Sequence, residues 1–109
     1  MNPLQHMDLN RRMFFVDGRN KDQIEWLKEK LKTPSPKVKN QIIEDRVILV
    51  GGSVFKIQDE LGENHRNKVY FDQSGELTTK FGIKASPAIA YQEGFQIKIE
   101  EIEVHDASN

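Results

Sequence analysis

The chain has 109 residues with 37% hydrophobic and 30% charged side chains, a length and composition that suit one folded domain with a single core. Its 16 basic and 17 acidic side chains nearly cancel to a formal net charge of -1, and no basic block occurs, so we expect no nucleic acid partner. No segment approaches the roughly 20 consecutive apolar residues that cross a bilayer, so we expect no direct membrane insertion.

The first part of the chain predicts a strand followed by a helix. Arg12–Val16 contains an unbroken apolar run, which is typical of a strand buried on both faces. Asn20 followed three residues later by Gln23 resembles a capping box, so a helix is predicted from there to about Lys32. Its inward stripe consists of Ile24, Leu27 and Leu31.

The middle of the chain predicts a second strand and a second helix. Residues 37–44 are short and ambiguous, whereas Val47–Val50 predicts another strand buried on both faces. Gly51 and Gly52 then turn the chain, and Ser53 can cap a helix that Gly62 ends. The apolar face of this helix consists of Val54, Ile57 and Leu61.

The last part predicts a short helix and a closing hairpin. The expected elements are a strand at Val69–Phe71, a helix at about Glu76–Phe81 with Leu77 and Phe81 inward, a strand at about Ala88–Gln92 and a final strand from Phe95. The apolar alternation slips at Glu100–Glu101, where we expect a β-bulge. Strand–helix–strand followed by a hairpin predicts a mixed β-sheet flanked by helices, an α/β fold.

The segment Phe81–Ile89 resembles the part of thioredoxin-like proteins in which a helix end precedes a cis-proline. The resemblance makes Ser86 and Pro87 the structural cis-proline candidate, and X-Pro bonds carry only a weak trans preference. In that fold the redox motif lies between the first strand and the next helix. Here this region reads Asp17-Gly18-Arg19-Asn20-Lys21, and the chain contains no cysteine. Without a thiolate the chain cannot carry out thiol–disulfide exchange.

Four residues are candidate partner contacts. Gly18, Arg19 and Asn20 occupy the position of the absent redox motif, and Trp26 lies about 130° around the helix from its apolar stripe. The alternative for Trp26 is cover by the chain's own N-terminus rather than by the core face. Ser86 and Pro87 either serve the fold alone or also dock a peptide.

Blocks along nearly the whole chain resemble the C-terminal half of the TraW family of F-type conjugative transfer systems. They are Asn2–Leu4, Leu9–Arg12, Phe14–Arg19, Val47–Ser53, Val69–Gln73, Leu77–Ile83, Pro87–Ala88 and Gln92–Ile102. The resemblance implies a periplasmic protein of type IV secretion that supports F-type pilus assembly, with a TrbC-type thioredoxin-like protein as its partner. It also implies that residues 1–109 are one thioredoxin-like domain of a longer protein, with 1–11 as an N-terminal extension.

No pattern predicts an enzyme, a cofactor or a metal site. His6, His65 and His105 are isolated, no nucleophile motif occurs, and the turn at Gly51–Ser53 lacks a full phosphate-loop signature. Arg11 and Arg12 precede the first strand and are expected in solvent at its edge, with a partner contact as the alternative.

The leading hypothesis is therefore a non-catalytic assembly or scaffold protein of a conjugative type IV secretion system. The alternative is a redox-inactive, thioredoxin-like chaperone or peptide-binding domain. A third hypothesis, an enzyme of unrecognised type, has no convergent acid, base and nucleophile in the sequence.

Overall fold

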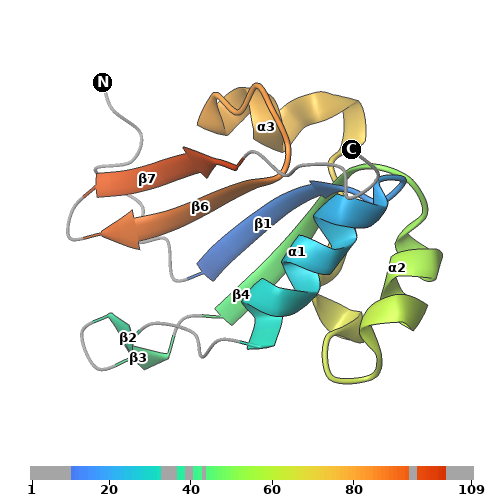
Figure 1. The fold of residues 1–109 in the computed structure, drawn as a ribbon. Coiled ribbons are helices and arrows are strands. Elements are labelled where there is room, and N and C mark those ends of the chain that lie inside the picture. The colour runs from blue at the N-terminus through green and yellow to red at the C-terminus, as the bar shows by residue number, and fades with distance from the viewer. Residues whose placement is uncertain (1–10, 33–36, 39–40, 43, 94–95, 103–109) are drawn as a thin grey trace.

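The computed structural model describes residues 11–32, 37–38, 41–42, 44–93 and 96–102. Over these residues the chain forms a mixed β-sheet with helices on both faces (Figure 1). In chain order the elements are β1 (Arg11–Asp17), α1 (Lys21–Lys32), β2 (Lys37–Val38), β3 (Gln41–Ile42), β4 (Glu44–Gly51), α2 (Val54–Leu61), η2 (Arg66–Lys68), β5 (Val69–Phe71), η3 (Gln73–Gly75), α3 (Glu76–Phe81), β6 (Ala88–Glu93) and β7 (Gln96–Glu101).

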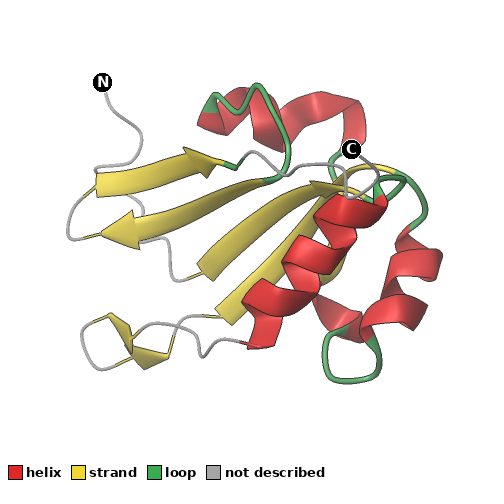
Figure 2. Ribbon diagram, viewed as in Figure 1, coloured by secondary structure: helices red, strands yellow, loops and turns green. Residues whose placement is uncertain are grey.

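The main sheet contains five strands in the order β5-β4-β1-β6-β7, which Figure 2 shows in yellow. β1, β4 and β5 are parallel, whereas β6 is antiparallel to both β1 and β7. The predicted parallel pair and the predicted antiparallel pairing of the closing strands are therefore confirmed. This mixed α/β architecture is consistent with a thioredoxin-like fold.

One face of the sheet, here called the α1/α2 face, is covered by α1 and α2. Phe14, Val47 and Val69 lie side by side on it in neighbouring strands. They pack against the predicted stripes of both helices, of which Ile24, Leu27 and Ile57 are buried. Each large apolar side chain buried in this way stabilises the fold by about 1.5–3 kcal/mol.

The opposite face, here called the α3 face, is covered by α3. Phe15 and Ile48 lie side by side on it and are buried. Leu77 and Phe81 of α3 pack against this cluster, and the rings of Phe15 and Phe81 meet edge to face with centroids 6.2 Å apart. The predicted inward direction of the α3 side chains is confirmed.

The start of α1 differs in one respect from a reciprocal capping box. The Asn20 Oδ1 atom accepts hydrogen bonds from the main-chain N–H groups of Asp22 and Gln23, at 3.0 and 3.1 Å. The Gln23 side chain does not return to Asn20: its Oε1 atom accepts from the Asp17 N–H at 2.8 Å. Gln23 therefore joins the start of α1 to the end of β1.

The ends of α2 follow the prediction. The Ser53 Oγ atom accepts a hydrogen bond from the Lys56 N–H at 3.3 Å, which caps the helix. Gly62 ends it with φ +87°, a conformation that favours glycine.

Two other expectations need revision. Residues Lys37–Val38 and Gln41–Ile42, ambiguous in sequence, form a small antiparallel pair apart from the main sheet. The β-bulge expected at Glu100–Glu101 is wrong, because the pairing of β6 and β7 continues to Glu101 without a shift in register. β7 ends at Glu101 instead. Ile102, the first apolar residue after the slip in the alternation, donates its N–H to the Pro87 carbonyl at 2.8 Å.

The expected solvent position of Arg12 is also wrong. Arg12 lies opposite Asp45 in the β1–β4 register, and its Nε and Nη2 atoms donate to the two Asp45 carboxylate oxygens at 2.8 and 3.0 Å. The side chains are only 12% and 6% exposed. The Arg12 guanidinium also lies over the Phe14 ring, 4.8 Å from its centroid. Arg12 therefore belongs to the interior edge of the α1/α2 face.

Candidate functional site

The candidate site lies where β1 and β4 end and β6 begins. At this end of the sheet the bend between β1 and α1 contacts the turn after β4 through main-chain atoms. The Gly18 N–H donates to the Gly51 carbonyl at 2.8 Å. A Cβ atom at Gly18 would lie 3.0 Å from that carbonyl oxygen, and one at Gly52 (φ +91°) would lie 3.0 Å from the Gly18 main chain. Glycine is required here because the two main chains touch.

An ion pair occupies the bend where the redox motif of a thioredoxin-like enzyme is expected. The Asp17 carboxylate accepts from the Arg19 N–H at 2.9 Å and from its Nε and Nη2 atoms at 3.0 Å each. The hydrogen bonds from the Arg19 side chain lower the pKa of Asp17, and partial burial opposes this shift. Arg19 is 72% exposed, so the pair presents a guanidinium to solvent in a fixed position.

Pro87 lies beside this bend. Phe15 of β1 is paired with Ala88 of β6, and the strands are antiparallel, so Pro87 precedes β6 at the end of β1 that leads into the bend. Pro87 is fully buried, and the Ser86–Pro87 peptide bond is cis. The region from Gly18 to Lys21 and the segment at Pro87 therefore lie at the same end of adjacent strands.

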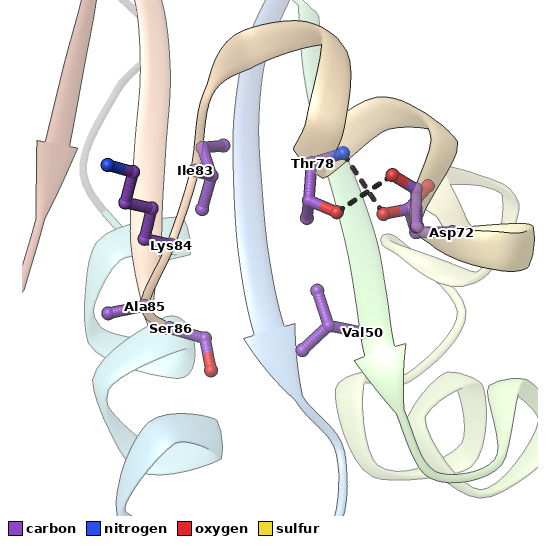
Figure 3. Close-up of a pocket in the computed structure, with 8 residues that line it drawn as sticks. Val50, Asp72, Thr78, Ile83, Lys84, Ala85 and Ser86 are labelled. Carbon is purple, nitrogen blue, oxygen red and sulfur yellow. Dashed lines mark hydrogen bonds between the residues drawn. The ribbon is translucent and has the colours of Figure 1, made fainter.

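A cavity of about 260 Å³ lies next to the segment that precedes Pro87. Figure 3 shows its wall: Val50 from the end of β4, Asp72 directly after β5, Thr78 of α3, and the segment from Ile83 to Ser86. Asp72 is 5% exposed, and its carboxylate accepts from the Leu77 and Thr78 N–H groups at 2.7 and 3.1 Å. This carboxylate caps α3, so its visible role at the cavity is structural.

The end of β7 holds the rim of this cavity. One oxygen of Glu101, Oε2, accepts hydrogen bonds from two successive main-chain N–H groups, Lys84 at 2.8 Å and Ala85 at 2.6 Å. Together with the bond from Ile102 to Pro87, these contacts join the last strand to both sides of Ser86.

Trp26 lies away from the bend. Its ring meets the buried Phe14 ring edge to face, with centroids 6.0 Å apart, and it is partly buried against the core. The structure thus brings Gly18, Arg19 and Asn20 to one end of the sheet with Pro87, and places Trp26 in the packing of α1.

Sequence reasoning missed several residues of this site. Asp72 and Glu101 hold main-chain N–H groups through their carboxylates, and neither forms a motif along the sequence. Asp72 lies four residues before α3, whose N-cap position is Gly75, so the usual preference for a capping residue does not point to it. Glu101 has no signal either, since its partners are 16 and 17 residues away in the chain.

No three His, Asp or Glu side chains of the described residues are grouped to hold a metal ion. His65 is the histidine within that range, and burial is the main cause that lowers its pKa. None of the described helices has the length and apolar character needed to cross a membrane.

Comparison with known proteins identifies a relative. The chain is 36% identical over 88 residues to Protein TraW of Escherichia coli (strain K12), a match that covers 81% of this chain. The chain spans 36% of that relative's length, about a third. No family model matches the chain, and no solved structure matches it. The match covers most of this chain, and the chain is a domain of the TraW family.

Proposed function

We propose that the chain is a non-catalytic assembly domain of a conjugative type IV secretion system, and that it supports F-type pilus assembly through protein–protein contacts. The observation that carries this proposal is the 36% identity to Protein TraW over 88 residues. We further propose that it acts in the periplasm and that its partner is a TrbC-type, thioredoxin-like protein of the same system.

The chemistry at the end of β1 supports recognition over electron transfer. The chain contains no cysteine, and an Asp17–Arg19 ion pair stands where a redox motif is expected. An exposed guanidinium held by a carboxylate offers directed hydrogen-bond donors to a partner. It offers no nucleophile for disulfide exchange.

Titration of the isotope-labelled chain with a purified TrbC-type protein tests this proposal. We expect amide signals of one continuous surface to shift. Complementation provides the second measurement: the longer protein that contains this domain should restore pilus formation and plasmid transfer to donors that lack their TraW-family gene. Absence of binding by both the domain and the longer protein, together with failure to complement, would refute the proposal.

The cavity beside Ser86 favours one second candidate, a redox-inactive peptide-binding domain. Val50, Ile83 and Ala85 give the cavity an apolar wall large enough for one side chain of a bound peptide. Unfolded peptides of unrelated sequence should then bind, and Ala85→Phe, which adds bulk at the exposed wall of the cavity, should weaken their binding about tenfold. Binding of only the dedicated partner would exclude this candidate.

A further inference from the structure

The large apolar side chains that are most exposed among the described residues are all aromatic and belong to two neighbouring elements. They are Phe55 of α2, which is 75% exposed, and Tyr70 and Phe71 of β5, which are 45% and 43% exposed. β5 is an edge strand of the sheet. Exposed aromatic side chains beside an open sheet edge are typical of an interaction surface.

The outer edge of β5 presents main-chain groups as well. The Asp72 N–H donates to the Leu49 carbonyl at 2.9 Å, so the groups of Tyr70 and Asp72 point toward β4. Because main-chain groups alternate along a strand, the N–H and C=O groups of Val69 and Phe71 point outward. Both groups of Phe71 and the C=O group of Val69 match the hydrogen-bonding pattern of an added strand, whereas the Val69 N–H closes the last turn of η2.

Phe55 extends this edge onto the α1/α2 face. It lies one helical turn before Asp59, which pairs with Arg66 at 3.4 Å in the segment that leads into β5. Glu60, on the other side of α2, lies 4.0 Å from Lys28 of α1. The side of α2 that carries Phe55 therefore turns toward β5. Phe71 shares the same sheet face, whereas Tyr70 lies on the α3 face.

Arg46, Lys56 and Lys68 give this edge positive charge, and the nearby Asp59 is paired with Arg66. The Arg46 guanidinium lies over the Tyr70 ring at 5.2 Å, and its Nη1 atom donates to the Tyr70 hydroxyl at 3.0 Å. Lys68 directly precedes β5 and Lys56 follows Phe55 in α2, and within the described residues no salt bridge involves either ammonium.

This charge decides which occupant fits. A second copy that paired its β5 with this one would bring Arg46 and Lys68 of both copies to a common edge, and like charges repel. A partner with acidic side chains has the complementary charge.

We propose that the β5 edge, defined as β5 with Phe55, Arg46 and Lys68, binds an extended partner segment in which apolar and acidic side chains alternate. The segment adds a sixth strand to the sheet, covers Phe55 and Phe71 with its apolar side chains, and places carboxylates near Arg46 and Lys68. This inference rests on the proposed function, because it assigns the surface through which the partner is bound.

Short synthetic peptides test it with the full chain. A peptide of alternating valine and glutamate should bind and shift the amide signals of Val69 and Phe71. The same peptide with lysine in place of glutamate, and a glutamate peptide with alternate main-chain nitrogens methylated, should bind at least tenfold more weakly. Equal binding of all three peptides, or shifts elsewhere on the chain, would overturn the inference.

Variants at exposed positions sharpen the test. Phe55→Ser and Phe71→Ser should each weaken the glutamate peptide about tenfold, and Lys68→Glu should weaken it several-fold at low salt. Lys98→Glu on β7, the opposite edge strand, is the matched charge reversal and should leave binding unchanged. Sedimentation of the chain as a dimer that Phe55→Ser dissociates would overturn the inference in favour of a second copy.

A titration with the whole partner protein separates the two proposals. If that protein binds and neither Phe55→Ser nor the glutamate peptide weakens it, the surface assignment is wrong and the proposed function stands. If the peptide binds at β5 and the partner protein does not bind, the surface assignment stands and the partner named in the proposed function is wrong.

Discussion

The ion pair between Arg12 and Asp45 joins β1 and β4 at the edge of the core, and Asp45→Ala removes its acidic member. Both side chains are nearly buried, at 12% and 6% exposure, and two hydrogen bonds of 2.8 and 3.0 Å connect them. Loss of one partner of a buried pair costs about 3–5 kcal/mol, because the remaining charge stays in a poorly solvated site. Some solvent reaches Arg12, so we expect a loss near the lower end, about 3 kcal/mol.

Urea unfolding measures this loss, with fluorescence of the single tryptophan, Trp26, as the signal. Trp26 contacts Phe14 in the core, so its emission should change when the sheet and α1 separate. With a denaturant slope of about 1.5 kcal/mol per molar, a loss of about 3 kcal/mol lowers the unfolding midpoint by about 2 M. A small domain has only about 5–15 kcal/mol of stability in total, so this is a large fraction.

Two further variants make the reasoning refutable. Asp59→Ala removes the acidic member of an exposed pair with Arg66, in which Asp59 is 73% exposed, and should change stability by less than about 0.5 kcal/mol. The double variant Arg12→Met, Asp45→Leu removes both charges together and should be more stable than Asp45→Ala. If Asp45→Ala costs no more than Asp59→Ala, or if the double variant is the least stable, the interpretation of a buried, mutually dependent pair is wrong.

Three further predictions concern α1 and the bend. Trp26→Ala should destabilise the fold by about 2–3 kcal/mol, measured by circular dichroism, and leave partner affinity unchanged; weaker binding with unchanged stability would instead identify an interface anchor. Arg19→Gln should raise the pKa of Asp17, measured by carbon NMR of its carboxyl group. In the folded chain the pKa of Asp17 is below its ordinary value of 3.8, so the pair stabilises the fold above about pH 4. This contribution is lost as the pH falls through the folded pKa. An unchanged pKa of Asp17 in the variant would contradict the geometry. Gly52→Ala should cost about 1–3 kcal/mol because its φ is +91°. Gly51→Ala should cost less, because its Cβ atom would meet only side chains, those of the Arg19–Asp17 pair, with Arg19 Nη2 at 2.8 Å and Asp17 Oδ1 at 3.0 Å; equal losses would refute this distinction.

The strands and helices were predictable because local patterns determine them. Apolar runs identified β1 and β4, and the side chains of Asn20 and Ser53 marked helix starts where the structure has caps. The β-bulge was predicted wrongly for a related reason. Alternation shows which face a side chain prefers, and it does not show where a strand ends, so the slip at Glu100–Glu101 marked the end of β7.

Contacts between distant segments were beyond the sequence pattern. Arg12 and Asp45 are 33 positions apart, and only the register of β1 and β4 brings them together. The contact of the Trp26 ring with Phe14 likewise depends on how α1 packs on the sheet. The angle of Trp26 around the helix axis, which is all that the sequence provides, does not contain this information. The place of Pro87 at the end of β1 followed from the resemblance to a fold, since no local pattern links the two.

The hydrogen bonds of Glu101 couple the end of β7 to the segment before Ser86, in addition to the bond from Ile102 to Pro87. Lys84 and Ala85 can leave β7 only if both of their N–H groups give up the same carboxylate oxygen. A protein that displaced the end of β7 would therefore also move the cavity wall at Lys84 and Ala85. A molecule bound in the cavity would in turn displace the end of β7. Glu101→Gln, which weakens the hydrogen bonds to Lys84 and Ala85, should weaken this coupling, whereas the bond from Ile102 to Pro87 stays.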